Sequence, residues 1–451
     1  IGATVTVQGT SIGATTDLDG KFTLTGVSNV AKAVLIVRYV GMEEAKEPLK
    51  GRTSNINIHM KEAVGMLDDV VVIGYGTQKR GNLTGSIASV SGKILEKVQT
   101  TSAAEAIVGK LPGVQVTAVD GSPDAEIKIL VRGGGSITQD NSPLIILDGF
   151  EVGSLNDVPP TDIESIEVLK DAASTAIYGA RGANGVILVT TKRPVEGRVV
   201  ISLNTYVQTK ELSNKLDVMD PYEFVLMQYE NARQKSSNPT AFNNKYGHAY
   251  EHYMYQGNAG KDWQDEVFGS NPVAKYVDLS VNGGTEKTRY LASVNYMNQE
   301  GIVKNNGVSR FSARLNLDQE LSEYVSFGLT ATYSQNKYDN VPLGDNANEY
   351  SGVLTGAIQS NPTIPIYDSE GNYFIDPKRP FVANPVSLLD IKDNTVKDRI
   401  IGSAFVSVKP LKDLEVKLQL GVDRSFQKRS SYLPKTTLQG KTKNGRADIS
   451  Q

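Results

Sequence analysis

Residues 414–423 read LEVKLQLGVD, in which apolar and polar side chains alternate along the chain. Successive side chains of a β-strand point to opposite faces, so this alternation gathers the apolar residues on one face. That face carries Leu414, Val416, Leu418, Leu420 and Val422, and the other carries Glu415, Lys417, Gln419 and Asp423. The stretch predicts a β-strand that lies between an apolar environment and a polar one.

Six further runs between residues 196 and 451 show the same period of two: 199–203, 277–281, 290–296, 311–317, 325–333 and 400–408. The segments that connect the runs alternate in length. Those at 210–274, 299–307 and 336–397 are long or intermediate, and those at 284–285, 320–321 and 410–411 are tight. Transmembrane β-barrels sort their connections in this way, with short turns at one rim and long loops at the other. A large soluble antiparallel sheet is the alternative that the alternation leaves open.

Seven strands do not complete such a barrel. Bacterial single-chain barrels have an even number of strands, and an open sheet edge leaves backbone groups unpaired in lipid. We therefore expect a mainly β protein whose residues 196–451 form the first seven or so antiparallel strands of a truncated transmembrane β-barrel. On this interpretation the chain is the N-terminal part of a longer protein.

The first 193 residues have a different pattern. Alternating runs at 4–7, 21–24, 34–37 and 56–58 predict a small β-sandwich. Residues 80–193 predict a mixed α/β segment, with strands at 127–131, 144–147 and 186–190 and a short helix that begins at 101–105. The run 162–178 predicts a second helix, because Ile163, Ile166 and Leu169 recur at helical spacing.

Composition excludes several classes of function. The chain of 451 residues has 47 basic and 50 acidic side chains, a balance that gives no reason to expect a nucleic-acid partner. It contains no cysteine, which excludes disulfides, cysteine-ligated zinc and thiol nucleophiles. We therefore expect no cofactor and no metal.

Several blocks of sequence resemble one family, the SusC/RagA-type TonB-dependent transporters of Bacteroidetes outer membranes. The blocks are VRGGGSI (131–137), PLIILDG (143–149), WQDEVF (263–268), NQEGIV (298–303) and, most specifically, DIESIEVLKDAASTAIYGARGANGVILVTTK (162–192). The resemblance covers essentially the whole chain. It implies a carboxypeptidase-regulatory-like domain at 1–62, a linker at 63–79, a plug domain at 80–193 and part of a barrel at 196–451. A complete barrel of this plugged type has about 22 strands.

The resemblance also implies particular site residues. The plug motifs fall on Arg132, Gly133, Gly134, Gly135, Asp148, Gly149, Tyr178, Gly179, Arg181, Gly182, Asn184 and Gly185. The segment before the plug matches the TonB box of the family, at Asp69, Val70, Val71, Val72, Ile73, Gly74 and Tyr75. An extended β-branched segment between two domains suits strand addition to a partner's sheet. The alternative is a strand that pairs within a neighbouring domain.

The function implied by the resemblance is active import of an oligosaccharide or a peptide across the outer membrane. TonB, with its inner-membrane energising complex, would pull on residues 70–75 and remodel the plug, and a SusD-like surface lipoprotein would cover the barrel. Residues 1–193 would lie in the periplasm or inside the barrel. A TonB-linked receptor that transduces a signal is the alternative.

The first long connection contains two further candidate groups. Aromatic side chains give polar ligands an apolar platform, and Tyr246, Tyr250, Tyr253, Tyr255 and Trp263 are expected either to face substrate or to pack the loop. Residues 248–252 also fit the H-x-x-E-H pattern of a zinc hydrolase. On an α-helix His248 and His252 would share a face, with Glu251 beside them. Because short motifs match by chance, we expect a protein that is not an enzyme.

Overall fold

The computed structural model describes residues 3–8, 10, 12–17, 20–27, 29–31, 33–38, 45–54, 56–60, 70–73, 76–79, 87–98, 100, 102–118, 121–123, 125, 127–138, 140–234, 239–269, 271–344, 352–411 and 414–451. The chain forms two compact units, Ile1–Gly85 and Ser86–Gln451. Among the described residues, no helix is both long enough and apolar enough to cross a bilayer.

The first unit contains a four-stranded antiparallel sheet in the order β2-β1-β3-β4. Its strands are β1 (Thr4–Val7), β2 (Gly13–Thr15), β3 (Val34–Arg38) and β4 (Ala45–Pro48). Alternate residues of β1 and β3 point to one face and, with Leu49, form a small apolar core. Residues 21–24 and 56–58, expected as strands, do not join the sheet, but they add Phe22, Leu24, Ile56 and Ile58 to this core.

The same unit contains a separate hairpin. Strand β5 (Val70–Ile73) pairs antiparallel with β6 (Gly76–Lys79), with Val71 opposite Gln78. In the described part of the chain neither strand pairs with any other, so β5 is hydrogen-bonded along one edge only.

Residues 87–193, which we call the plug segment, form two small sheets. The larger has the order β11-β10-β13-β12-β7, and β8 pairs with β9 in the other. The strands are β7 (Ile87–Ser91), β8 (Val114–Ala118), β9 (Ile127–Val131), β10 (Leu144–Leu147), β11 (Phe150–Glu151), β12 (Ile163–Leu169) and β13 (Val186–Thr191). The helices are α1 (Gly92–Leu95), α2 (Ala103–Ala106), η2 (Pro160–Asp162), α3 (Ala172–Thr175) and η3 (Ala176–Gly182).

Most of the elements expected in the plug segment are confirmed. Strands β9, β10 and β13 lie where they were predicted, and α2 begins after Ser102, whose side chain accepts a hydrogen bond from the Glu105 backbone amide. The helix predicted over 162–178 is wrong in its first half. Residues 163–169 form β12, which pairs with β7 and β13 and is apolar on both faces. A fully buried strand has no alternation, so its apolar residues can fall at helical spacing by chance.

Residues 197–450 contain one antiparallel sheet of eight strands, which we call the wall, and the strands follow one another in chain order. They are β14 (Gly197–Thr209), β15 (Val273–Gly284), β16 (Thr288–Glu300), β17 (Gly307–Glu320), β18 (Val325–Asn340), β19 (Lys392–Leu411), β20 (Leu414–Leu433) and β21 (Arg446–Ser450). The seven predicted strands are confirmed, and the sheet has an eighth strand, β21, in which the sequence showed no alternating run. Its five residues contain only two apolar ones, too few to establish a period.

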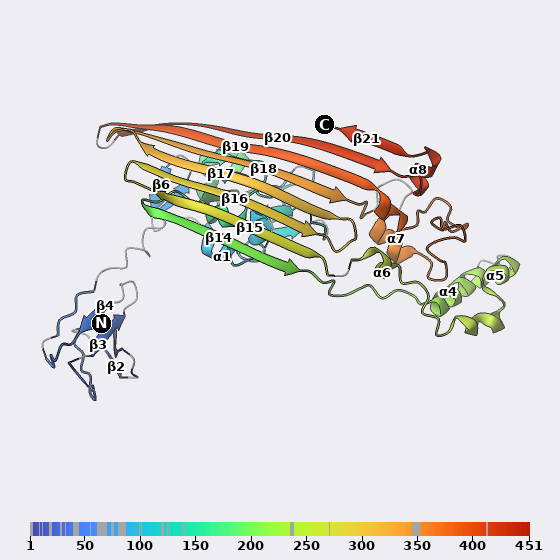
Figure 1. Cartoon of the computed structure of the whole chain (residues 1–451), viewed down its shortest axis with the longest axis horizontal. Coiled ribbons are helices and arrows are strands. Elements are labelled where there is room, and N and C mark those ends of the chain that lie inside the picture. The colour runs from blue at the N-terminus through green and yellow to red at the C-terminus, as the bar shows by residue number, and fades with distance from the viewer. Residues whose placement is uncertain are drawn as a thin grey trace. The chain divides into compact units, whose positions relative to one another are not determined.

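The short connections between wall strands lie at one end of the sheet and the long ones at the other, as predicted. The turns at 285–287 and 321–324 lie at the end of the sheet where β14 begins, and the described parts of the long connections lie at the other (Figure 1). Connection 210–272 contains α4 (Pro221–Gln234), α5 (Pro239–Tyr246), η4 (Ala249–Tyr255) and α6 (Trp263–Val267). Connection 341–391 contains α7 (Val353–Gln359) and η5 (Ser387–Asp390), and α8 (Leu438–Thr442) precedes β21.

The two faces of the wall have opposite chemistry. The outer face carries the apolar residues of the alternating runs, and many of them are exposed, including Leu203, Val294 and Leu418. The inner face lies against the plug segment (Figure 1) and carries polar and charged side chains that are buried there. A soluble sheet would have the reverse arrangement. An exposed apolar face and a buried polar one fit a wall with lipid outside and a polar interior.

Neighbouring residues of β14 test this orientation, because Leu203 faces outward and Asn204 inward. Arginine near the bilayer midplane costs about 2–4 kcal/mol on the lipid face of a barrel. We expect Leu203→Arg to lower the stability of the full-length protein in lipid by about that amount, and Asn204→Arg to change it by much less. Urea titration of folding into lipid vesicles measures both. Equal effects of the two variants would contradict the assigned outer face.

Candidate functional site

The inner face of the wall meets the plug segment through a buried polar seam. Wall residues with exposed fractions below 9% in this seam include Asp278, Ser293, Asn295, Arg310, Ser312, Arg314, Asn316, Ser334, Asn336 and Arg399. Buried polar groups are costly unless they are hydrogen-bonded. Most of these side chains find partners on the plug segment, at three main points.

The first point is Asp157 of the plug segment, which is 2% exposed. Its carboxylate accepts hydrogen bonds from Arg399 Nη1 at 2.9 Å, from Lys397 Nζ at 3.4 Å and from Asn336 Nδ2 at 2.8 Å. Arg399 also grips Asp423 with Nε and Nη2, at 2.9 and 2.7 Å. Burial alone would raise the pKa of Asp157, but the charges of Lys397 and Arg399 hold it below its ordinary value. The carboxylate is therefore a charged anchor between plug and wall.

The second point is η2, which lies directly before the first residue of strand β12. Thr161 Oγ1 lies 2.9 Å from Tyr276 Oη and donates to Asp278 Oδ2 at 3.3 Å. Ser293 Oγ donates to the Asp162 carboxylate at 2.9 Å. These contacts join η2 of the plug segment to β15 and β16 of the wall.

The third point is the tight turn between β10 and β11. Asp148 and Gly149 have φ values of +50° and +83°, as a two-residue hairpin turn requires. The Asp148 carboxylate accepts from the Thr191 backbone amide at 2.9 Å and lies 3.5 Å from Arg314 Nη2. Gln419 of the wall donates to the Asp148 carbonyl at 3.1 Å. The predicted plug residues Asp148 and Gly149 thus shape a turn that docks on the wall.

The other predicted plug residues lie in two segments that meet each other. The loop after β9 contains Arg132, Gly133, Gly134 and Gly135. The second segment is η3 with the turn that follows it, and it contains Tyr178, Gly179, Arg181, Gly182, Asn184 and Gly185. Asn184 Nδ2 donates to the Asp140 carbonyl at 3.1 Å and so joins the two segments. Gly185 has φ +90°, and a Cβ there would lie 2.8 Å from Val131 Cβ, so only glycine fits. Arg181 forms an ion pair with Glu151 of β11.

The predicted coupling segment is described in part. Val70, Val71, Val72 and Ile73 are the strand β5, whereas Asp69, Gly74 and Tyr75 lie outside the described residues. A strand of four β-branched residues with one unpaired edge has the backbone geometry for strand addition.

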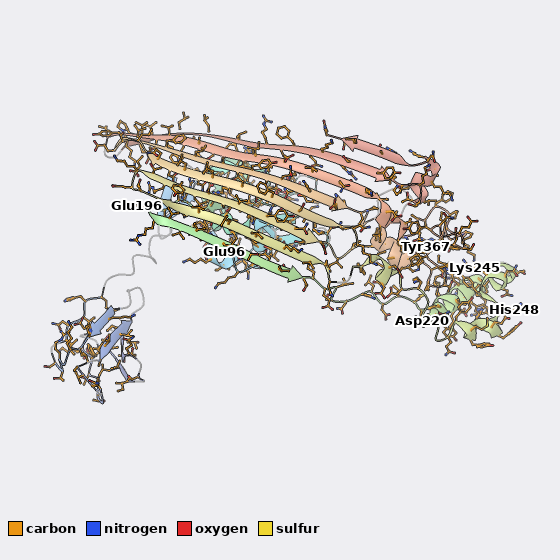
Figure 2. All side chains as sticks on the ribbon, viewed as in Figure 1. Glu96, Glu196, Asp220, Lys245, His248 and Tyr367 are labelled. Carbon is orange, nitrogen blue, oxygen red and sulfur yellow. The ribbon has the colours of Figure 1, made fainter. Side chains whose placement is uncertain are left out.

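The five candidate aromatic residues have different environments. Tyr246 and Trp263 are buried, and both line a cavity of ≈ 440 Å³ between the two long connections. Tyr255 packs beside Tyr246 in the core of the helical lobe formed by α4, α5 and η4, whereas Tyr250 and Tyr253 are exposed on η4. Figure 2 shows Lys245 and His248 in this lobe, far from Glu196 at the start of the wall.

The H-x-x-E-H residues do not form a zinc site. They lie at η4, a 3₁₀-helix, in which residues four apart do not share a face. Glu251 Oε2 accepts a hydrogen bond from the His248 backbone amide at 2.6 Å, and His252 is buried against the rings of Tyr229 and Phe242. Across the described ranges, no three His, Cys, Asp or Glu side chains are grouped to hold a metal ion.

Sequence reasoning missed the seam residues Asp157, Arg310 and Arg399. The sequence did contain a signal for the two arginines. Each lies at an inward, polar position beside an alternating run that was recognised from its apolar residues. Asp157 lies in a loop of the plug segment, where no periodicity marks it.

Asp157 gives a direct test of plug docking. Removing one partner of a buried ion pair costs about 3–5 kcal/mol. We expect Asp157→Asn to weaken docking on this scale and to raise hydrogen–deuterium exchange of residues 148–162 in the full-length protein. Glu230→Gln, in an exposed pair with Arg233 on α4, should have an effect below about 1 kcal/mol.

The same comparison has a predicted pH dependence. The depressed pKa of Asp157 stabilises the docked state above the pKa of an unfolded aspartate, about 3.9. That contribution is lost as the pH falls through the depressed value. The difference between wild type and Asp157→Asn should hold at neutral pH and fade only in strong acid. Unchanged exchange in Asp157→Asn at neutral pH would contradict the anchoring role.

Comparison with known proteins identifies the parts of the chain. Residues 79–186 match the TonB-dependent receptor plug domain, and residues 1–72 match the carboxypeptidase-regulatory-like domain. A TonB-dependent receptor of Formosa agariphila is 32% identical over 99% of this chain and 42% of its own length. The TonB-dependent receptor SusC of Bacteroides thetaiotaomicron is 33% identical over 83% of this chain and 35% of its own length.

A solved structure has the same fold. The structure of the RagAB peptide importer in its open-open state superposes with a TM-score of 0.68 at 27% identity, and covers 81% of this chain and 43% of its own chain. The chain thus spans about 40% of the relatives that it matches. These relatives are TonB-dependent receptors and a peptide importer. Over the length that it spans, the chain is similar to SusC-like TonB-dependent receptors in its regulatory-like domain, its plug domain and its wall strands.

Proposed function

We propose that the protein imports a nutrient across the outer membrane, with the plug segment as a gate that TonB remodels by pulling on β5. The observation that carries the proposal is the polar seam. The plug segment has its own apolar core, in which Ile401 is the one wall residue among those described. Its remaining contacts with the wall are largely hydrogen bonds and ion pairs. Water can replace such contacts far more readily than apolar burial, so the plug can leave the wall without losing its own fold.

Strand β5 is the proposed point of coupling. TonB, in complex with its inner-membrane energising proteins, would add a strand to the free edge of β5. Main-chain hydrogen bonds along such a pair resist a pull independently of side-chain identity. The match of residues 79–186 to the plug domain supports this assignment, because β5 lies directly before that domain.

The proposed substrate is an oligosaccharide or a peptide, and the proposed second partner is a SusD-like surface lipoprotein. The relationship to SusC and to the RagAB peptide importer supports both. The long connections 210–272 and 341–391 would face the lipoprotein and the incoming substrate, since they lie at one end of the wall.

Two proline variants of the full-length receptor test the coupling strand. Successive backbone amides of a strand point to opposite edges, so Val71→Pro and Val72→Pro each remove a donor from a different edge of β5. We expect the variant on the free edge to abolish binding of the periplasmic domain of TonB in titration calorimetry. Val71→Thr keeps the donor and the β preference and should bind like the wild type. If both proline variants bind normally, β5 is not the coupling strand.

A further inference from the structure

Arg310 on β17 has an unusual environment for a buried cation. It is 2% exposed, and its Nη1 donates to the carbonyl of Asn156 in the plug segment at 3.2 Å. Its Nε and Nη2 are buried and have no hydrogen-bond partner among the described residues. Leaving donors of a charged group unpaired in the interior is costly, so such an arrangement calls for a functional explanation.

The two unpaired nitrogens form one edge of the guanidinium group. Nε and Nη2 donate in parallel, in the geometry that grips both oxygens of a carboxylate. Two other arginines of the wall use this same edge in this way. Arg399 holds Asp423, and Arg429 holds Asp393 through Nε at 2.8 Å and through Nη2. Among the described residues, no carboxylate pairs with the equivalent edge of Arg310.

Asp157, an acidic group of the seam whose charge acts on Arg310, already has other partners. Asp157 accepts hydrogen bonds from Asn336, Lys397 and Arg399, and it makes none with Arg310. The described residues of the plug segment thus supply Arg310 with a carbonyl oxygen and with no ion pair.

The surroundings of Arg310 form a small cavity of ≈ 230 Å³ between plug and wall. Its polar lining includes Ser102, Glu105 and Asn156 of the plug segment, and Lys210, Arg310 and Asn336 from the wall and its first connection. Among the described lining residues, two are cationic and one is a carboxylate. Burial lowers the pKa of Lys210, and the charge of Glu105 opposes that shift.

The cavity adjoins the side from which substrate would arrive. Asn156 and Tyr338 line both this cavity and a larger one of ≈ 610 Å³. The larger cavity is also lined by Val341, Pro342 and Leu388 of the second long connection. A ligand that enters between the long connections would therefore meet Arg310 at the surface of the plug segment.

We propose that the Nε–Nη2 edge of Arg310 binds a carboxylate group of the imported molecule, which makes the substrate an acidic oligosaccharide or an acidic peptide. This inference rests on the proposed import function and specifies its substrate class. The bound carboxylate would pair with Arg310 in the way that Asp423 pairs with Arg399 and Asp393 pairs with Arg429. Because Arg310 also donates a hydrogen bond to the Asn156 carbonyl, the ligand would bind where the plug segment contacts the wall.

Paired probes test the proposal on the purified full-length receptor. One pair is tetragalacturonate and its methyl ester, and the other is an acetylated, amidated pentapeptide with a central Asp or Asn. We expect one acidic probe to bind about 10- to 100-fold more tightly than its neutral partner, the range for a charge-assisted hydrogen-bond pair. The pair that shows the preference distinguishes an acidic sugar from an acidic peptide.

Three variants assign the effect to the guanidinium edge. Arg310→Met should remove the preference, and Arg310→Lys, which keeps the charge without the two-donor edge, should retain only part of it. Arg233→Met, on the exposed face of α4, should leave it unchanged. The affinity for the neutral probe of each pair is the control for folding. If Arg310 had a purely structural role, its replacement would weaken binding of the acidic and the neutral probe equally. No preference in either pair, or a preference that survives in Arg310→Met, overturns the proposal.

The experiment separates this inference from the proposed import function. Equilibrium binding needs no TonB, so loss of energised coupling would leave the charge preference intact. Conversely, normal TonB binding without a charge preference would refute the carboxylate site alone.

Discussion

The constraint on which the structure depends is the reversed polarity of the wall. Its strands place apolar side chains outward and polar ones inward, and many of the inward ones on β15 to β19 are buried beneath the plug segment. An exposed apolar face is stable only against lipid, and a buried polar face is stable only if the covering domain supplies partners. The plug segment supplies them through Asp148, Asp157 and Asp162. The chemistry of the wall thus determines where the acidic groups of the plug must lie.

The stability of the plug segment itself and the stability of its docking on the wall thus have different physical origins. The plug segment keeps its fold through an apolar core of its own, and it stays in place through polar contacts with the wall. The first kind resists a pulling force because apolar burial is lost only on unfolding. The second kind can be exchanged for contacts with water. A gate that moves as a body needs both.

Much of the fold could be predicted because it follows from periodicity. Seven wall strands, the two lengths of connection and the strands β9, β10 and β13 all carry local patterns. Strand β12 could not be recognised, since it has buried residues on both faces and therefore lacks a clear alternation. The short β21 gave too few residues for a pattern.

The site was less accessible to sequence reasoning. The glycine and asparagine residues of the plug loops were expected from the family, and the structure explains Gly149 and Gly185 by turn geometry and close packing. The pairing of Asp157 with Arg399 joins residues far apart in the chain, so no local pattern could reveal it. The unpaired edge of Arg310 is a property of its surroundings and is likewise invisible in a single sequence.

The central claim, that the polar seam opens when TonB pulls, can be tested without knowing the substrate. Residues 1–451 contain no cysteine, so Ser293→Cys adds one thiol to this part of the protein, beneath the plug segment at a position 5% exposed. The cysteine-free parent, in which any cysteine of the remaining protein is replaced by serine, serves as the background. A membrane-impermeant maleimide would be applied to living cells, with Tyr250→Cys on the exposed η4 as the control. We predict that a proton-motive force accelerates labelling at position 293. A protonophore should abolish this acceleration, and so should whichever of Val71→Pro and Val72→Pro removes the donor on the unpaired edge of β5. Labelling at position 250 should stay constant. Equal labelling at 293 with and without the force would contradict the account.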